Sequence, residues 1–401
     1  MTFIRNQFAT VPAFAACLLL QASCATQSPS LVAATPFCSV ADLEFHTDFE
    51  GARLYACATG DSGPVLTIAP EFAPINPSSW YAWRVVPADP GEVIIRQRYL
   101  HGQHRYDPWI SLDGVRWDQL PADATTRGKD GEIAFRVRLP ENGLYIAAQP
   151  ILSNAGMEEW AARLAARHGL DAVPVARTPG GRAVTAWQME PTEARGLVVF
   201  IGRQHPPEVT GGQAFQDFVE RIFMADDLAV KFRSQFAIGL LPNLNPDGMA
   251  RGHWRTNRRG VDLNRDWGPF TEAETRGAAA WITALDQRTP LLLFLDFHST
   301  WLDVFYTQHE SDNPHPHGFT TAWKESLQER LGDDMPAWSG SHNPGLPTAK
   351  TWVRKIFDAT AMTYEVADTT PRPLIRKKAV AAAEEMMKLM LTLEVESDDR
   401  E

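Results

Sequence analysis

Residues 196–208 read GLVVFIGRQHPPE, and the first half of this stretch indicates the fold class. The run GLVVFI at 196–201 has no polar alternation, which is typical of a strand buried on both faces of a sheet. Three further runs share this character: residues 236–241, 291–295 and 360–364. Helical patterns lie at residues 156–168, 213–224, 272–285, 318–331 and 376–393. Strands alternating with helices predict an α/β domain over residues 151–395, with a mixed, mostly parallel sheet covered on both faces.

A different pattern precedes this domain. Between residues 38 and 150, short strand-like runs such as 65–68, 80–86, 92–95 and 133–139 are separated by turns rich in Pro, Gly and Asp. Regular short strands with such breaks predict an antiparallel β-sandwich. No residue set in this region has the spacing of a catalytic site, so we expect its aromatic residues to form a core.

The N-terminus resembles an export signal. Arg5 is the only charge in residues 1–25, and an apolar run at 11–20 is followed by small residues. This run is shorter than the roughly 20 residues that a membrane span needs, so we expect a signal peptide at 1–25, a linker at 26–37 and no transmembrane helix. Two readings stay open: cleavage after Ser23-Cys24-Ala25, or a bacterial lipobox with lipid on Cys24. Either predicts a periplasmic or envelope-associated protein.

Export bears on two remaining cysteines. Cys38 and Cys57 follow the predicted signal and flank strand-like segments. In an oxidising compartment they can form a disulfide, and the alternative is a pair of buried free thiols.

The charge balance excludes some classes of partner. The chain has 38 basic and 49 acidic residues, so its net charge is 38 − 49 = −11. A nucleic-acid-binding surface needs clustered positive charge, and so does electrostatic docking on anionic lipid. We therefore expect neither partner. The tail at 396–401 is strongly acidic and is predicted to lie outside the folded domains.

Residues with metal-ligand chemistry follow two of the predicted strands. His205 and Glu208 form an H-x-x-E pair after the strand ending at residue 201, and His298 follows another buried run. Each signal is weak alone, because such pairs and lone histidines are common on surfaces and in cores. If both strands end at one edge of the sheet, however, the three residues complete a His₂Glu set. That set is typical of a catalytic zinc ion.

A second group of polar residues lies between the metal-ligand candidates. Arg255, Asp262, Asn264 and Arg265 occur within a stretch rich in Gly, Asn and Trp. The stretch could be a solvated loop, but dense arginine also suits a carboxylate-binding pocket, because guanidinium offers paired donors to a planar anion. Glu365 follows an apolar run, and a buried carboxylate there can serve as a general base.

Taken together, these motifs resemble the zinc carboxypeptidase family of metallopeptidases. The resemblance rests on their order and covers about residues 196–368: HPPE at 205–208, NPDG at 245–248, WR at 254–255, GVDLNR at 260–265, DFHS at 296–299 and TYE at 363–365. Residues 80–85 and 107–117 resemble, more loosely, the β-sandwich of the cytosolic-carboxypeptidase, deglutamylase-like branch. An exported bacterial relative of that branch is implied.

The resemblance implies roles for the metal site. His205, Glu208 and His298 would hold one zinc ion per chain, and Asp262 would accept a hydrogen bond from the free nitrogen of His205. Glu365 would take a proton from the zinc-bound water and return it to the leaving amine.

It also implies how a peptide with a free C-terminal carboxylate is held. Arg255 would stabilise the oxyanion, while Asn264 and Arg265 would clamp the terminal carboxylate. The position fifteen residues before the catalytic glutamate lies at the base of the family's specificity pocket. Here it is Lys350, which favours an acidic C-terminal residue unless a loop of different length leaves it exposed.

Two local features depart from the family pattern or add to it. The family's tyrosine that closes over substrate is absent from the corresponding stretch at 341–345. Residues 308–317 contain His309, His315 and His317, which predict a substrate-rim loop or, alternatively, a second metal site.

Three other functions remain as alternatives. One is an amidase or carboxypeptidase acting on peptidoglycan stem peptides, and another is a deacylase of N-acyl amino acids, which the arginine cluster disfavours. The third is a catalytically silent peptide-binding protein. The joint presence of the ligands, the base and the oxyanion arginine favours an enzyme.

Overall fold

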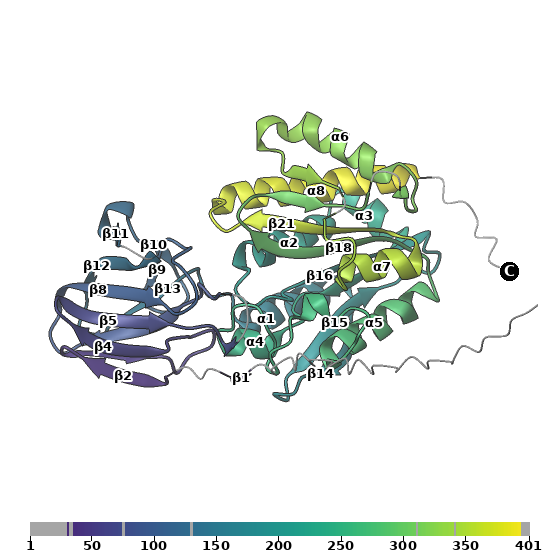
Figure 1. Cartoon of the computed structure of the whole chain (residues 1–401). Helices are drawn as coiled ribbons and strands as arrows, with labels where there is room; N and C mark the ends of the chain where they lie inside the picture. The colour runs from purple at the N-terminus through teal and green to yellow at the C-terminus, as the bar shows by residue number, and fades with distance from the viewer. Residues whose placement is uncertain are drawn as a thin grey trace, which may run out of the picture.

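The computed structural model describes residues 30–31, 35–73, 77–128, 131–309, 312–340 and 342–393. The predicted signal peptide at 1–25, including Cys24, and the acidic tail at 396–401 lie outside the described residues. An N-terminal β region and a larger α/β region lie side by side (Figure 1). Within the described part, none of the helices combines the length and the apolarity that a membrane span requires.

The α/β region is built on a mixed eight-stranded sheet. In spatial order its strands are β14 (Asp171–Arg177), β15 (Ala183–Met189), β17 (Phe236–Leu241), β16 (Gly196–Gly202), β18 (Leu291–Thr300), β21 (Thr360–Ala367), β19 (Val304–Tyr306) and β20 (Ala337–Ser339). The four central strands β17, β16, β18 and β21 are mutually parallel, whereas β14, β15 and β19 pair antiparallel with inner neighbours. The central strands are the apolar runs of the sequence, because they are buried on both faces.

Helices cover both faces of this sheet. On β16, Val198 and Phe200 belong to one core cluster, while Val199 and Ile201 belong to another. The first core includes residues of α1 (Asn154–His168), α2 (Val209–Ile222), α3 (Asp227–Arg233), α6 (Phe319–Leu331) and α8 (Arg372–Thr392), and the second includes residues of α5 (Ala273–Asp286) and α7 (Ala349–Phe357). Figure 1 shows the two helical layers with the sheet between them. The predicted α/β architecture is confirmed.

Short helices complete the connections of the region. They are α4 (Pro246–Ala250) and the single 3₁₀ turns η3 (Leu263–Arg265) and η5 (Gly332–Asp334). Both α4 and η3 lie in the stretch that carries the arginine and asparagine cluster.

The N-terminal region consists of two sheets around one hydrophobic core. The first has the order β10 (Asp118–Gln119), β9 (Trp109–Ser111), β13 (Leu144–Ala147), β7 (Ala82–Pro87), β3 (Leu43–His46) and β2 (Phe37–Val40). The second has the order β11 (Thr125–Arg127), β12 (Ile133–Leu139), β8 (Gly91–Tyr99), β5 (Gly63–Ile68) and β4 (Ala56–Gly60). A 3₁₀ turn η1 (Ala122–Ala124) and a small pair of β1 (Ser30–Leu31) with β6 (Phe72–Ala73) accompany them.

One pairing departs from the predicted antiparallel pattern. Strands β5 and β8 run parallel, with Val65 opposite Arg96. Between them the chain crosses to the other sheet as β7 and then returns, so it re-enters the second sheet in its original direction. The expectation of a wholly antiparallel region is therefore wrong at this position.

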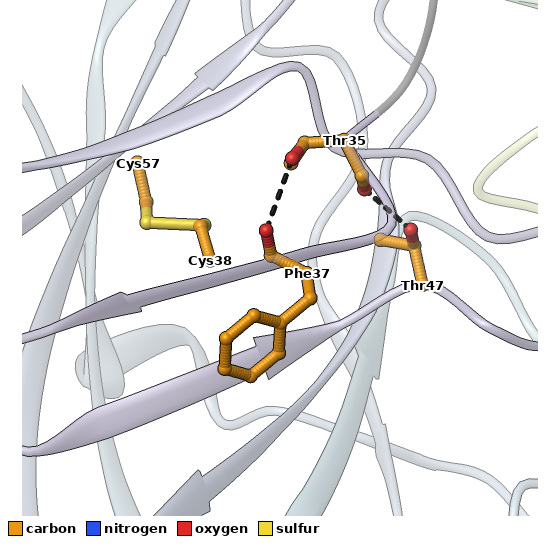
Figure 2. The surroundings of a disulfide bond; sticks show 5 residues. All are labelled: Thr35, Phe37, Cys38, Thr47 and Cys57. Carbon is orange, nitrogen blue, oxygen red and sulfur yellow. Dashed lines mark hydrogen bonds between the residues drawn. A yellow bond between two sulfur atoms is a disulfide. The ribbon is translucent and has the colours of Figure 1, made fainter.

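A disulfide joins the two sheets of the N-terminal region. Cys38 on β2 and Cys57 on β4 are bonded, with their Cα atoms 6.3 Å apart (Figure 2). Strands β2 and β4 are the end strands of their respective sheets. The predicted bridge, rather than two free thiols, is what the structure contains, and it ties together two edges that no backbone ladder connects.

Candidate active site

Three side chains with metal-ligand chemistry converge beyond the carboxyl end of β16. His205 follows β16, Glu208 directly precedes α2, and His298 lies near the end of the neighbouring parallel strand β18. Their ligand atoms all lie within 4.8 Å of one another. A Glu208 oxygen is 2.8 Å from His205 Nδ1, the other is 2.7 Å from His298 Nδ1, and the two Nδ1 atoms are 3.2 Å apart. The two strand ends thus bring together the residues that the sequence predicted.

A close approach between helix and strand fixes this convergence. At Gly211, in the first turn of α2, an added Cβ would lie 2.3 Å from the carbonyl oxygen of His298. Only glycine allows the helix to start so near the strand. Ser299 Oγ also accepts hydrogen bonds from Gly211 N and from Thr210 Oγ1, both at 2.8 Å. The start of α2, and with it Glu208, is therefore held against the strand that carries His298.

Each imidazole is oriented by a carboxylate on its other side. His205 Nε2 lies 3.0 Å from Asp262 Oδ1, and His298 Nε2 lies 2.8 Å from Asp296 Oδ2. In metal sites such partners fix the tautomer and the ring orientation. With both Nδ1 atoms turned toward Glu208, the donor set is two nitrogens and a carboxylate, which suits a zinc ion with an open fourth position.

The family resemblance implied Asp262 as the partner of His205, but it implied no partner for His298. Asp296 lies two residues before His298 in β18, so their side chains project from the same face of the strand. Its side chain is fully buried, and its Oδ2 also accepts a hydrogen bond from Gln204 Nε2 at 2.7 Å. The two-residue spacing within a buried strand was the signal that could have identified it.

Two carboxylates of the site, Glu208 and Asp262, are poised to stay ionised. Burial alone would raise the pKa of Glu208, but His205 and His298 lower it well below its usual range. Burial would likewise raise the pKa of Asp262, while His205 and Arg255 hold it well below the ordinary value. An anionic Glu208 is the form that binds a cation.

Glu365 lies beside the metal-ligand cluster. In the register of β18 and β21 it is the Cα partner of His298, and its Oε2 is buried without a hydrogen-bond partner among the described residues. Burial raises the pKa of Glu365 to about 7, with His298 acting in the opposite direction. A buried carboxylate with a free oxygen and a pKa near neutrality can accept a proton from water.

Arg255 and Asn264 reach the same site from the loop between β17 and α5. Arg255 Nε donates to Asp262 Oδ2 at 2.6 Å, so one carboxylate orients both Arg255 and His205. Asn264 Nδ2 lies 3.3 Å from His298 Nε2, and its Oδ1 accepts from Ala349 N at 3.0 Å. The Asn264 amide is thus already engaged within the protein, which the sequence did not indicate.

Lys350 and Arg265 supply positive charge to the pocket. Lys350, near the start of α7, is 6% exposed, and its Nζ donates to the carbonyl oxygens of Thr307 and His342, both at 3.1 Å. Arg265 donates to the carbonyl oxygen of Asn264 at 2.8 Å. The alternative of an exposed Lys350 is wrong, because α7 directs it inward.

These groups surround one cavity of about 310 Å³. Its lining contains the predicted residues His205, Glu208, Arg255, Asn264, Arg265, His298, Lys350 and Glu365. The other lining residues include Arg105 and Tyr106 from the N-terminal region, and Tyr306 and His342, none of which was predicted. Arg105 has an ion pair with Asp368, just beyond β21, with Nε 2.8 Å from Oδ2. Long-range packing of this kind leaves no local motif in the sequence.

Tyr306 bears on the missing tyrosine of residues 341–345. It lies on β19 and stacks on His342, with ring centroids 3.8 Å apart. A tyrosine therefore does line the pocket, but it comes from strand β19 rather than from residues 341–345. In the His-rich segment, the described residues form no second cluster of three metal-ligating groups.

Comparison with known proteins agrees with this geometry. Residues 157–370, more than half of the chain, match the family model described as zinc carboxypeptidase. An uncharacterized protein of Zymomonas mobilis is 29% identical over 235 residues, which are 56% of this chain and 59% of that protein. The cytosolic carboxypeptidase-like protein 5 of Bos taurus is 46% identical over 162 residues, or 38% of this chain and 18% of that protein. The chain thus spans less than two thirds of the length of either relative.

Solved structures share the fold over most of the chain. A metallo-carboxypeptidase from Burkholderia cenocepacia aligns with a TM-score of 0.70 and 21% identity, covering 87% of this chain and 98% of that one. A metallo-carboxypeptidase from Pseudomonas aeruginosa aligns with a TM-score of 0.69 and 21% identity, covering 88% and 100%. Part of the chain is therefore similar to cytosolic carboxypeptidase-like proteins, and the chain belongs to the zinc carboxypeptidase family.

Proposed function

We propose that this protein is a zinc-dependent carboxypeptidase that hydrolyses the C-terminal bond of peptides and favours an acidic C-terminal residue. The observation that carries the proposal is the content of the 310 Å³ cavity. It holds a His₂Glu metal-ligand set, a buried carboxylate and four cationic side chains, Arg105, Arg255, Arg265 and Lys350. A peptide end with two carboxylates matches that distribution of charge.

The reaction assigned to these residues is the addition of water to the scissile carbonyl. Zinc held by His205, Glu208 and His298 would lower the pKa of a water molecule and polarise the carbonyl group. Glu365 accepts the proton that the attacking water loses. As the C–N bond breaks, the same carboxyl group returns this proton to the amine that leaves.

Arg255 is assigned to the charge that develops on the carbonyl oxygen. Its guanidinium is held at Nε by Asp262, which leaves its terminal N–H groups for the substrate. A donor aimed at an oxyanion typically lowers the activation free energy by about 3–4 kcal/mol.

Recognition of the peptide end is assigned to Arg265, Asn264 and Lys350. Arg265 has the fork of donors that binds a terminal carboxylate in a bidentate manner. Lys350 uses two of its three donors on carbonyl oxygens, which leaves one for an acidic side chain of the C-terminal residue. Both acceptors are uncharged, so the positive charge of Lys350 is available to a bound anion.

A location outside the cytoplasm is part of the proposal. It is supported by the Cys38–Cys57 disulfide, because such bonds persist in oxidising compartments. The lipid anchor at Cys24 and the domain limits at 38–150 and 151–395 remain predictions.

The test is a digest of a C-terminal peptide library by the purified protein, followed by mass spectrometry. The proposal expects release of single C-terminal residues, Glu and Asp fastest, and loss of activity with a chelator. Muropeptides form a parallel arm, because stem peptides also end in free carboxylates. Cleavage of muropeptides alone would contradict the proposed substrate class, and no hydrolysis in either arm would contradict the enzymatic function.

A further inference from the structure

The loop that carries Arg255 is packed against the N-terminal region at both of its ends. At Gly252, with φ of 62°, an added Cβ would lie 2.6 Å from the carbonyl oxygens of Gly51 and Ala52. At Gly260, with φ of 82°, it would lie 3.0 Å from the Phe72 ring. Both positions therefore require glycine for backbone conformation and for space. Residues 252–260 therefore pack directly against the segments around residues 51 and 72, and the two sides form one contact surface.

Glu71 is the polar contact at the centre of this surface. It is fully buried, and its Oε1 accepts hydrogen bonds from Arg255 N at 2.9 Å, Thr256 N at 3.0 Å and Thr256 Oγ1 at 3.1 Å. A single carboxylate oxygen thus fixes two successive peptide N–H groups, one of them that of Arg255 itself. Hydrogen bonds to a charged acceptor are stronger than those to a neutral one.

The segment that bears Glu71 is itself held in place. Arg53, which is 2% exposed, donates from Nε to the carbonyl oxygen of Ala69 at 3.1 Å and from Nη2 to that of Pro70 at 2.9 Å. Glu71 Oε2 is buried without a hydrogen-bond partner among the described residues. Burial alone would raise the pKa of Glu71, but His253 and the two N–H groups lower it, so the carboxylate stays charged. Burying a charged carboxylate costs free energy unless hydrogen bonds or ion pairs compensate for the lost hydration.

The loop connects this contact to the metal-ligand cluster. The backbone N–H of Arg255 is bonded to Glu71, and its side-chain Nε donates a hydrogen bond to Asp262. Asp262 is also hydrogen-bonded to His205 Nε2. The guanidinium lies between two anchors: a backbone anchor from the N-terminal region and a side-chain anchor from the α/β region. Without the first anchor, the second still holds Nε, but the loop can shift.

From these contacts we infer that Glu71 is a positioning residue, which aims the Arg255 guanidinium by fixing the backbone of residues 255 and 256. The inference rests on the proposed function, in which Arg255 meets the oxyanion. Because that charge appears only in the transition state, losing Glu71 should lower kcat and leave KM nearly unchanged. A misplacement of about 1 Å costs on the order of 100-fold in rate.

The experiment compares variants of the full-length protein loaded with zinc. Glu71→Leu removes the acceptor at similar volume, and Glu71→Gln keeps an acceptor oxygen. Gln97→Leu is the matched control: Gln97 is fully buried in the N-terminal region and hydrogen-bonds Tyr99 and Trp83, away from the loop. Thr256→Val removes one of the three donors and replaces Glu71→Leu if that variant fails to fold.

We expect Glu71→Leu to lose about 100-fold in kcat, with KM changed by less than about twofold. Glu71→Gln should keep most of the wild-type kcat. Gln97→Leu should keep the wild-type kcat even if its Tm falls as far as that of Glu71→Leu. In an Arg255→Ala background, Glu71→Leu should cost no further rate, because it acts through Arg255. An additive loss in the double variant, or a wild-type kcat in Glu71→Leu, would overturn the inference.

A second readout does not depend on turnover. Hydrogen–deuterium exchange at the amides of residues 255 and 256 should be faster in Glu71→Leu than in wild type, and unchanged in Gln97→Leu. Unchanged exchange in Glu71→Leu would refute the positioning role even if the proposed hydrolysis is correct. Conversely, a wild-type protein with no peptidase activity would refute the proposed function, while the exchange data would still decide whether Glu71 fixes the loop.

Discussion

His298 and Glu365 are direct neighbours across the parallel strands β18 and β21. Paired positions project from the same face of a sheet, so a metal ligand and the proposed base are brought together by strand register alone. Neither residue depends on a flexible loop for this relationship. The pairing of two central parallel strands therefore sets the distance between them.

Replacing the proposed base should separate metal binding from turnover. Glu365→Gln keeps the shape of the side chain but cannot accept a proton from water. We expect kcat to fall about 10³-fold, while zinc content, measured by plasma emission spectrometry, stays at one ion per chain. Equal activity in wild type and variant would remove Glu365 from the mechanism.

The buried Asp296 should matter for metal affinity. Asp296→Asn weakens the bond to His298 Nε2 and removes a negative charge next to the site. Loss of such an outer partner typically lowers metal affinity about 10–100-fold, which competition with a fluorescent zinc chelator can measure. Asp303→Asn, a change at a carboxylate that binds Lys378 and the start of the β21–α8 turn, serves as a control for buried charge. The same affinity loss in both variants would contradict a specific role.

Selectivity for acidic C-termini should depend on Lys350. Lys350→Met keeps much of the apolar stem and removes the charge. We expect the ratio of kcat/KM for Glu-terminated over Leu-terminated peptides to fall about 30-fold, corresponding to about 2 kcal/mol for a lost buried charge pair. A ratio that stays unchanged would show that another cation reads the terminal side chain.

The same preference should depend on pH. Burial lowers the pKa of Lys350 to about 8 from its ordinary value of 10.5, with Asp296 acting in the opposite direction. The ammonium form is present below this pH and is lost above it, so the Glu-over-Leu ratio should decline as pH rises past about 8. In Lys350→Met the ratio should be flat over the same range, and a parallel decline there would assign the effect to another group.

The disulfide should contribute to stability and not to chemistry. Cys38 and Cys57 are 19 residues apart, and closing a loop of that size restricts the unfolded chain by about 3 kcal/mol. The double variant Cys38→Ser/Cys57→Ser should unfold at lower urea concentration, with kcat and zinc content unchanged. An unchanged midpoint would mean that the two sheet edges are held by other contacts.

Much of the α/β region could be predicted from local sequence. Continuous apolar runs identified the central strands because burial on both faces excludes polar residues from them. The helix predicted at 213–224 is observed as α2 at Val209–Ile222. The prediction began it four residues late because Thr210, Gly211 and Gly212 are poor helix formers. Close contact with β18 requires Gly211, and Thr210 hydrogen-bonds Ser299 of that strand, so packing outweighs propensity there.

The site was predicted where the motif residues lie close in sequence or follow neighbouring strands. The three metal ligands are of this kind, whereas the role of Asp262, 57 residues from His205, was implied by the family resemblance alone. Arg105, Tyr306 and Glu71 escaped prediction because their roles come from contacts between segments far apart in the chain. Glu71 and Arg255 are separated by 184 residues, and no periodicity or motif links them.

The ion pair between Arg105 of the N-terminal region and Asp368 of the α/β region makes the binding pocket depend on both regions. Arg105 also lies over the rings of Trp254 and Trp301, at 5.1 and 4.3 Å from their centroids. A fragment trimmed to the α/β region would lose one wall of its own cleft and leave Asp368 and Trp254 without their charged partner. Exchanging the N-terminal half between relatives would therefore transplant part of the substrate-binding surface, and chimeras built at residue 150 should inherit selectivity from both parents.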